Sequence, residues 1–245
     1  QNELLVYYQP VHDLKTCRLI GVEALVRWEH PQRGLVSPAQ FIPIAERTGL
    51  IAQIDAWVMR QACEQMCQWL RAGVALSFVA VNVSSRLFAG RELYQQVAQV
   101  LRETGLDPAC LELEVTESAV MEDPEVALEQ MHRLRELGVQ LAIDDFGTGY
   151  SSLLRLKRLP VQKLKIDQGF VAGLPCDEDD AAIVRVIIAL AQSMGMQVQA
   201  EGIEQVEQAA FLLEHGGHLG QGYWFGRPVP AMLLDWARTP VISPR

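Results

Sequence analysis

The chain has 245 residues, of which 49% are hydrophobic, so it can form a sizeable core as one α/β barrel or as two small domains. Its net charge is −9 and it has no run rich in Lys and Arg, which argues against a groove for polymeric nucleic acid. A small phosphorylated ligand held through metal ions is compatible with this charge. No apolar run approaches the roughly 18 residues of a membrane span, and no signal peptide leads the chain, so we expect no membrane contact.

The cysteines indicate a reducing compartment. Their number is odd and they are scattered, which is typical of a cytoplasmic protein, at positions Cys17, Cys63, Cys67, Cys110 and Cys176. The first residue is not Met, so we expect the sequence to be a fragment of a longer protein.

The N-terminal part predicts a hairpin followed by two helices. Residues 4–11 and 18–28 have the composition of strands, and the segment between them is short enough for a tight connection, so the two strands should be antiparallel. Ser37-Pro38 then supplies a helix N-cap and a proline at the first helical position, which predicts a helix to about Arg47. A longer helix should cover residues 51–72 and end at Gly73.

The rest of the chain predicts alternating strands and helices. We expect strands at residues 79–83, 111–116, 141–145, 163–167, 197–201 and 219–225, with helices at 92–103, 124–138, 179–194 and 205–214. Alternation of this kind indicates a parallel sheet covered on both faces. Eight strands in a chain of this length favour a (β/α)8 TIM-type barrel with one antiparallel strand from the hairpin. An open doubly wound sheet is the alternative, but the glycine-rich phosphate loop that it would normally carry is not found.

One stretch is central to the functional interpretation. An apolar run ends in Asp144 and Asp145, and Gly147-Thr148-Gly149 follows at once. Two adjacent carboxylates repel each other, more so when buried, and a divalent cation is the usual remedy. The glycines would let the backbone turn sharply close to a ligand. The alternative is an Asx-rich turn whose acids are solvated.

Seven of the eight expected strands carry an acid, an amide or a lysine near one end. Barrel enzymes place their chemistry where the strands end, so these side chains favour one convergent site. Oxygen ligands without His or Cys point to Mg²⁺ or Mn²⁺ rather than Zn²⁺, and the acids suffice for two ions. The residues concerned are Glu23, Asn82, Glu112, Glu114, Asp144, Asp145, Lys163, Lys165, Asp167, Glu201 and Gln221.

A series of motifs runs through almost the whole chain. They are Glu23-Ala24-Leu25 within GVEALVRWEHP, VNVS at 81–84, LELEVTES at 111–118, DDFGTGYSSL at 144–153, LKID at 164–167, AEGIE at 200–204 and QGYWFGRP at 221–228. In these motifs the chain resembles the EAL domain family, the cyclic di-GMP-specific phosphodiesterases. The resemblance implies one barrel domain over residues 1–245 that hydrolyses cyclic di-GMP to linear pGpG with two Mg²⁺ or Mn²⁺ ions. It also implies that Ca²⁺ inhibits this reaction.

The resemblance also implies roles for individual residues. One ion would be held by Glu23, Asn82, Glu114 and Asp144, and a second by Asp144, Asp145 and Glu201. Lys165 would hold the attacking water in line with one phosphorus, with Glu23 and Glu201 completing the catalytic set. Glu117 would hold the loop after Asp145 in place. Ligand contacts are expected from Gln9, Leu25, Arg27, Asp167, Gln221 and Tyr223.

Two other functions are compatible with these residues. A catalytically silent receptor would bind cyclic di-GMP and signal to a partner, but such proteins usually lose part of the signature or of the metal set, which this chain keeps. A metal-dependent barrel enzyme that stabilises enolates would need neither the Glu23-Ala24-Leu25 nor the Gln221-Gly222-Tyr223 context. Lys165 and Arg27 could also be plain ion-pair partners of the acids.

The family further implies assembly and context. We expect a homodimer, coupled to activity through residues 147–156 and the segment after them. A GGDEF or sensor domain upstream in the full protein is also expected.

Overall fold

The N-terminal hairpin has the expected antiparallel pairing. The computed structural model describes residues 3–90, 92–148, 153–238, 240 and 242. Strand β1 (Leu4–Asp13) pairs with β2 (Leu19–His30) in a register that sets Gln9 opposite Glu23. On its other side β1 runs antiparallel to β9 (Leu219–Gln221). Strand β1 therefore joins the two ends of the sheet and is the antiparallel member of the barrel.

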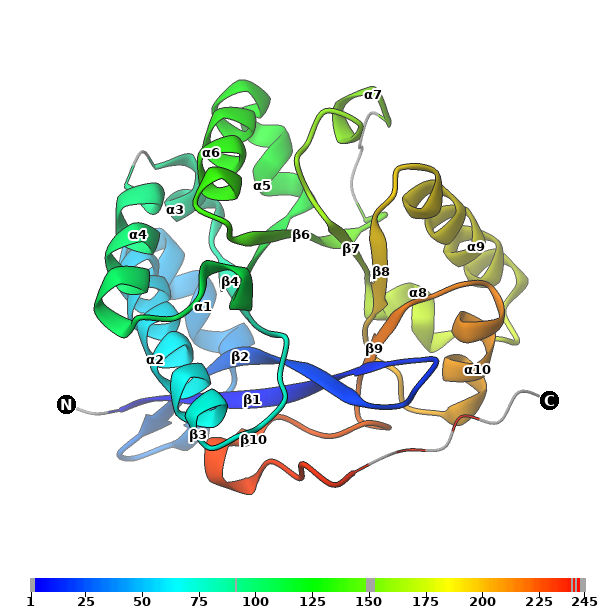
Figure 1. Cartoon of the computed structure of the whole chain (residues 1–245), viewed down its shortest axis with the longest axis horizontal. Helices are drawn as coiled ribbons and strands as arrows, with labels where there is room; N and C mark the ends of the chain where they lie inside the picture. The colour runs from blue at the N-terminus through cyan, green and yellow to red at the C-terminus, as the bar shows by residue number, and fades with distance from the viewer. Residues whose placement is uncertain (1–2, 91, 149–152, 239, 241, 243–245) are drawn as a thin grey trace.

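The other barrel strands are parallel and follow one another in sequence order. After β2 come β4 (Phe78–Val83), β5 (Leu111–Thr116), β6 (Gln140–Phe146), β7 (Lys163–Ile166) and β8 (Gln197–Ala200), and then β9. Two short strands extend the barrel, β3 (Gly34–Val36) beside β2 and β10 (Val229–Pro230) beside β1. Figure 1 shows the strands as an inner ring with the helices around it. The prediction of a (β/α)8 barrel with one antiparallel strand is confirmed.

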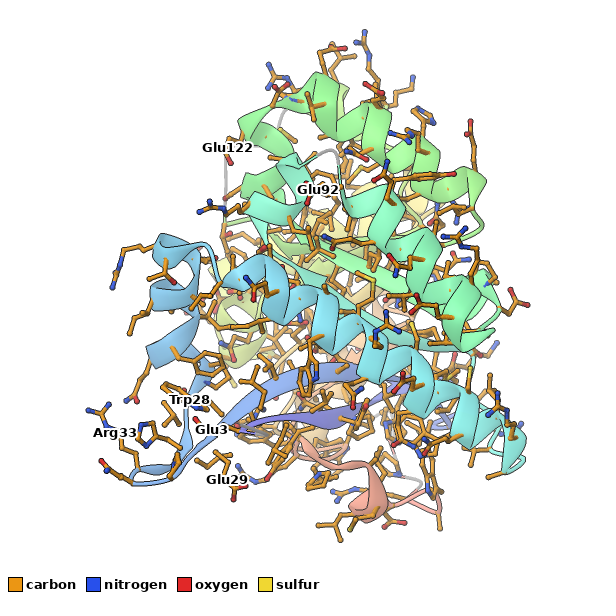
Figure 2. The ribbon with its side chains drawn as sticks, turned by 90° about the vertical axis from the view of Figure 1, so that its left-hand side faces the viewer. Glu3, Trp28, Glu29, Arg33, Glu92 and Glu122 are labelled. Carbon is orange, nitrogen blue, oxygen red and sulfur yellow. The ribbon has the colours of Figure 1, made fainter. Side chains whose placement is uncertain are left out.

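The long helices lie close to their expected positions. They are α1 (Pro38–Thr48), α2 (Ile51–Arg71), α4 (Leu93–Thr104), α6 (Pro124–Glu136), α9 (Glu178–Ser193) and α10 (Val206–Glu214). Their apolar faces pack on the outer face of the strands and form the main core. Figure 2 shows α2 lying along the outside of the hairpin. None of the helices in the described part of the chain is long and apolar enough to cross a membrane.

In the described part of the chain, four short helices were not expected from the sequence. They are α3 (Ser85–Ala89), α5 (Glu117–Glu122), α7 (Leu153–Leu156) and α8 (Gln168–Ala172), and two 3-10 turns accompany them at Pro108–Cys110 and Ala231–Leu233. The four helices are four to six residues long, which is too short for a helical period to show in the sequence. Helices α3, α5 and α8 each begin at the end of a barrel strand, where the side chain of Ser84, Thr116 or Asp167 accepts a hydrogen bond from the first turn.

The last barrel strand is shorter than expected. The prediction of a strand over residues 219–225 is wrong beyond Gln221, because the chain turns at Gly222, whose φ is 152°. A Cβ atom on Gly222 would lie 2.2 Å from the backbone nitrogen of Ile203, so only glycine fits this close approach. Phe225 is fully buried and stacks on His12 with ring centroids 4.8 Å apart. It therefore packs inside the fold.

The inside of the barrel is apolar at one end and polar above it. Val11, Phe78, Ala80 and Leu219 form a small apolar cluster of buried residues. The next inward positions toward the site carry amides: Asn82 follows Ala80 and Gln221 follows Leu219 by two residues, and Gln9 precedes Val11 by two on the antiparallel β1. Side chains alternate along a strand with a period of two, so the inner face of each strand continues from this cluster toward its carboxyl end. The polar side chains are thereby brought to one end of the barrel.

Candidate functional site

Lys165 lies at the centre of the polar end of the barrel. It comes from β7 and is fully buried. Its Nζ donates to Glu114 Oε2 at 2.6 Å and lies 2.6 Å from Glu201 Oε1 and 3.2 Å from Asp144 Oδ1. These acids come from three different strand ends, which the parallel register places side by side. Ion pairing by Lys165, one of the interpretations of the sequence, is thus observed.

A second group of side chains surrounds Glu23 of β2. Glu23 Oε1 accepts a hydrogen bond from Asn82 Nδ2 at 2.6 Å, and Glu23 Oε2 accepts one from Gln221 Nε2 at 2.5 Å. Gln221 Nε2 also donates to Gln9 Oε1 at 3.0 Å. All four side chains point inward from neighbouring strands, and Glu23, Gln9 and Gln221 are buried. Both oxygens of Glu23 are therefore fixed by amide donors.

Three of the predicted metal ligands form a cluster that could bind a cation. Asp144, Asp145 and Glu201 each offer one carboxylate oxygen, and these atoms lie within 4.8 Å of one another. Asp145 has a φ of 54°, which is unusual for a residue with a side chain, and its backbone N–H donates to Asp144 Oδ1 at 3.0 Å. Strained backbone of this kind is typical of functional sites. It turns the second carboxylate toward the first, which a regular strand would not do.

The electrostatics of the site reflect crowded acids around one cation. Burial raises the pKa of Glu201 to about 8, helped by Asp144 and Glu23 and opposed by Lys165. Burial likewise raises the pKa of Glu114 well above its ordinary value, and burial together with Asp144 raises that of Asp145. For Lys165 burial lowers the pKa, but the surrounding acids more than offset this and hold it well above its usual value. The site carries more negative charge than Lys165 can balance.

The donor set fits hard divalent cations. Among the described residues, the buried Glu114 Oε1 has no hydrogen-bond partner. Buried polar atoms are normally satisfied, so this unpaired carboxylate oxygen is a ligand atom available to a cation. The available donors are carboxylate and amide oxygens, which suit Mg²⁺ or Mn²⁺. Glu114 faces the cluster through its ion pair with Lys165.

The turn after β6 is held in place by the first residue of α5. Glu117, the first residue of α5, is buried, and its Oε2 accepts a hydrogen bond from the backbone N–H of Gly147 at 3.0 Å. Gly147 has a φ of 100°, which favours glycine. The contact ties the backbone next to Asp145 to the end of β5. Residues 149–152, within the segment 147–156 predicted to couple pairing to activity, lie outside the described residues.

A cavity of about 340 Å³ opens beside the acids. It is lined by Gln9, Glu23, Leu25, Arg27, Glu201, Gln221 and Tyr223 among the predicted site residues, together with Gln168, Gly202, Glu204, Gly222 and Pro228. Arg27 Nη1 donates to the carbonyl of Val26 at 2.8 Å, and its guanidinium lies 5.5 Å from the centre of the Tyr7 ring. Tyr223 is 47% exposed and faces the guanidinium of Arg227 at 3.9 Å. A more apolar cavity of about 280 Å³ adjoins it at Leu25 and Arg27.

Asp167 lies at the start of α8 rather than within a strand. Its Oδ1 accepts a hydrogen bond from the backbone N–H of Gly169 at 2.9 Å, so the side chain acts as a helix cap. It is near enough to Asp145 to contribute to the raised pKa of that residue. The structure thus places Asp167 at the border of the site with a local structural role of its own.

A buried layer lies beneath the site; the sequence placed Glu112 and Lys163 in the convergent site without an individual role and did not single out Gln199. Lys163 Nζ donates to Glu112 Oε1 at 2.7 Å and to Gln199 Oε1 at 3.2 Å, and Gln199 Nε2 donates to Gln221 Oε1 at 2.9 Å. Each of Lys163, Glu112 and Gln199 precedes a site residue by two positions. That spacing was the available signal, because residues two apart on a strand share a face.

Comparison with known proteins identifies the family. The model of the EAL domain matches residues 1–228, and the chain belongs to this family. It is 49% identical over 234 residues to the bifunctional diguanylate cyclase/cyclic di-GMP phosphodiesterase MucR of Pseudomonas aeruginosa, and 44% identical over 234 residues to the cyclic di-GMP phosphodiesterase NbdA of the same organism. The solved structure of the PaMucR phosphodiesterase in complex with c-di-GMP superposes with a TM-score of 0.91 at 49% identity, covering 95% of this chain and 94% of that one.

The chain corresponds to only part of its curated relatives. The alignments cover 96% of this chain but 34% of MucR and 30% of NbdA. Only a segment of each relative can therefore be compared with this chain.

Proposed function

We propose that this chain hydrolyses cyclic di-GMP to linear pGpG in a reaction that requires two Mg²⁺ or Mn²⁺ ions. The observation that carries the proposal is the convergence of Glu114, Asp144 and Glu201 on Lys165 beside an open cavity. It is supported by the similarity to MucR and NbdA, which are named as cyclic di-GMP phosphodiesterases.

The proposed ligands divide between two ions. Glu23, Asn82, Glu114 and Asp144 would hold one, and Asp144, Asp145 and Glu201 would hold the other. When bound, the ions would lower the pKa of a water molecule and offset negative charge on the phosphoryl oxygens. Ca²⁺, which takes more ligands at longer distances than Mg²⁺, is expected to inhibit.

The chain's own side chains would supply positioning and charge. Lys165 would give up part of its pairing with the acids to donate a hydrogen bond to the attacking water and hold it in line with the phosphorus. Arg27 would neutralise charge that develops on the phosphoryl group. The leaving atom is a ribose 3′ oxygen, so cutting one of the two phosphodiester bonds gives pGpG. Glu117 would act by holding the turn next to Asp145.

The cavities support an elongated ligand. Leu25 and Arg27 line both of them, so a molecule lying across these residues would contact the polar cavity and the apolar one. Gln9, Gln221 and Tyr223 would contact the part next to the acids. Tyr223 is exposed enough to stack on a guanine base. Asp167 would act from the border of the site.

The test is product formation by the purified chain. We expect linear pGpG in Mg²⁺ and in Mn²⁺, and at least about a hundredfold less from Glu23→Ala, a loss on the scale seen when a metal ligand's support is removed. Glu29→Ala is the matched control, because Glu29 is an exposed acid on the same strand and Figure 2 labels it at the far end of the hairpin. Tight binding of cyclic di-GMP without product would favour the receptor function. Neither binding nor product would contradict both.

We also propose that residues 1–245 form one catalytic domain of a longer cytoplasmic protein, with a GGDEF or sensor domain upstream. A homodimer is proposed for this domain. Sedimentation of the purified chain over a range of concentrations would test the dimer independently of catalysis.

A further inference from the structure

The layer beneath the site forms one continuous chain of hydrogen bonds. We call it the interior polar chain: Glu112, Lys163, Gln199, Gln221 and Glu23, in that order. All five side chains are buried, with Gln199 fully buried and Lys163 2% exposed. They come from five strands, so the interior polar chain crosses the inside of the barrel and ends at Glu23, a proposed metal ligand. Buried polar networks of this kind fix geometry strongly when every member is satisfied.

The interior polar chain has a direction that Lys163 imposes. A lysine ammonium only donates, so the amide oxygen of Gln199 must face Nζ at 3.2 Å and its NH₂ group must face the next residue. That NH₂ group donates to Gln221 Oε1 at 2.9 Å, which leaves Gln221 Nε2 pointing at Glu23 Oε2 at 2.5 Å. A carboxylate only accepts, so the far end requires the same direction. The interior polar chain thus runs from a fixed donor, Lys163, to a fixed acceptor, Glu23. The amides of Gln199 and Gln221 between them have one consistent orientation.

A second contact favours the same orientation of Gln221. Gln9 Nε2 donates to the carbonyl of Gly226 at 3.2 Å, so Gln9 Oε1 faces Gln221 and accepts from its Nε2 at 3.0 Å. If the Gln221 amide turned over, its oxygen would face the oxygens of Gln9 and Glu23 at hydrogen-bond distance. The resulting repulsion would displace Glu23, the residue that the proposed function places on a metal ion.

We propose that Lys163 and Gln199 are positioning residues that set which atom of the Gln221 amide faces Glu23, and thereby hold Glu23 in place for metal binding and hydrolysis. The effect on hydrolysis depends on the proposed function. The effect on the Gln221 amide does not, because it belongs to the metal-free protein.

The decisive variant is Gln199→Glu, with Gln199→Met as its matched control. The glutamate variant keeps the length of the side chain and adds an acceptor for Lys163, but it offers Gln221 only acceptors, so the Gln221 amide must turn over. The methionine variant keeps the length, removes both hydrogen bonds and leaves Gln221 free to donate to Glu23. We expect kcat/KM for cyclic di-GMP to fall more than about tenfold in the first and less than about threefold in the second, the contrast that reversed and absent hydrogen bonds should give.

Two further measurements separate orientation from other effects. The side-chain amide signals of Gln221 in the metal-free protein, assigned by their loss in Gln221→Leu, should shift in Gln199→Glu and change less in Gln199→Met. In the Gln221→Leu background, Gln199→Glu should cause no additional loss of Mg²⁺ affinity, whereas an added charge acting through space would still weaken or strengthen it.

The role of Lys163 is tested without leaving a lone buried charge. Replacing the pair together, Glu112→Leu with Lys163→Met, removes the donor that orients Gln199, so the Gln221 amide signals should broaden or double. Lys163→Arg keeps a donor and should retain the wild-type signals. Unchanged Gln221 signals in Gln199→Glu, or equal losses in the glutamate and methionine variants, would overturn the proposal. If the Gln221 signals shift in Gln199→Glu while the wild-type protein makes no pGpG, the positioning role stands and the proposed function is rejected instead.

Discussion

At the scale of single residues, Lys165 decides the charge balance of the site. It is fully buried among Glu114, Glu201 and Asp144, and its ammonium is the cation that they share. Removing one partner of a buried ion pair leaves the other charge uncompensated in the interior. Burial already raises the pKa of Glu114 and Glu201 with Lys165 present. Without Lys165 the protein can fold only if these acids bind protons or another cation.

We predict that Lys165→Met destabilises the metal-free protein by about 3–5 kcal/mol, the range for breaking a buried pair. Mg²⁺ should restore part of the loss, because a divalent cation can take over the neutralisation of the acids. Hydrolysis should fall by about 10²–10⁴-fold, as when a side chain that positions a proton is lost. Urea midpoints with and without Mg²⁺ measure the first effect. Lys157→Met, at an exposed lysine, is the control. Equal midpoints for both variants would contradict the argument.

The sequence was informative at this scale wherever an acid ended an apolar strand. Asp144 and Glu201 could be placed together because each ends an apolar strand, and Glu23 and Glu114 because each is an acid within one. Gln199 could not, since one amide in the middle of a short strand is also explained by local exposure. The positive φ of Asp145 was equally hidden, because it follows from the turn and not from the residue type.

At the scale of elements, the site depends on short helices that begin where strands end. The acceptor in α5 for the Gly147 N–H is Glu117, so α5 fixes the turn that follows β6. The sequence predicted a role for Glu117 through the family resemblance, but not the helix that carries it. A helix of six residues has no visible period, and its cap, Thr116, is also the last residue of β5. Tertiary contacts, not local pattern, decide its existence.

We predict that Glu117→Ala weakens Mg²⁺ binding by about tenfold, the lower end of the effect of losing an outer contact to a metal site. Without the acceptor, the Gly147 N–H loses its partner and the turn that sets Asp145 can move. Glu117→Gln keeps a side-chain oxygen and should lose less. Titration calorimetry with Mg²⁺ measures the affinities.

The control for the α5 contact is Glu122→Ala. Glu122 is an exposed acid at the other end of the same helix and is labelled in Figure 2. Its substitution therefore removes the same charge without affecting the turn after β6. Equal affinities in Glu117→Ala and Glu122→Ala would show that the contact does not support the site.

At the scale of the whole molecule, the strand order and the hairpin were predictable from the sequence, while the pairing that closes the barrel was not. Alternating elements implied a parallel sheet, and the short connection implied antiparallel β1 and β2. That β1 also pairs with β9 is a contact between the two ends of the chain, which no local pattern encodes. The end of β9 was placed four residues too late, because the tight approach of Gly222 to Ile203 is likewise a contact between distant segments.

The raised pKa values of the acids also govern the stability of the whole metal-free protein. The folded-state pKa of Glu201, about 8, lies above its unfolded value, and that of Glu114 is raised as well. Between pH 6.5 and 8 the folded state therefore binds more protons than the unfolded state, so its stability must fall as the pH rises. Below this window the buried His12, whose pKa is lowered to about 4, contributes the opposite slope.

We predict that the melting temperature of the metal-free protein falls by at least about 2–4 °C from pH 6.5 to 8, the shift for roughly 1 kcal/mol in a domain of this size. Saturating Mg²⁺ should remove the decrease, because the cation replaces the protons, and Glu201→Gln should flatten it without metal. Thermal melts at matched ionic strength test this, and a melting temperature that rises with pH in the metal-free protein would contradict it.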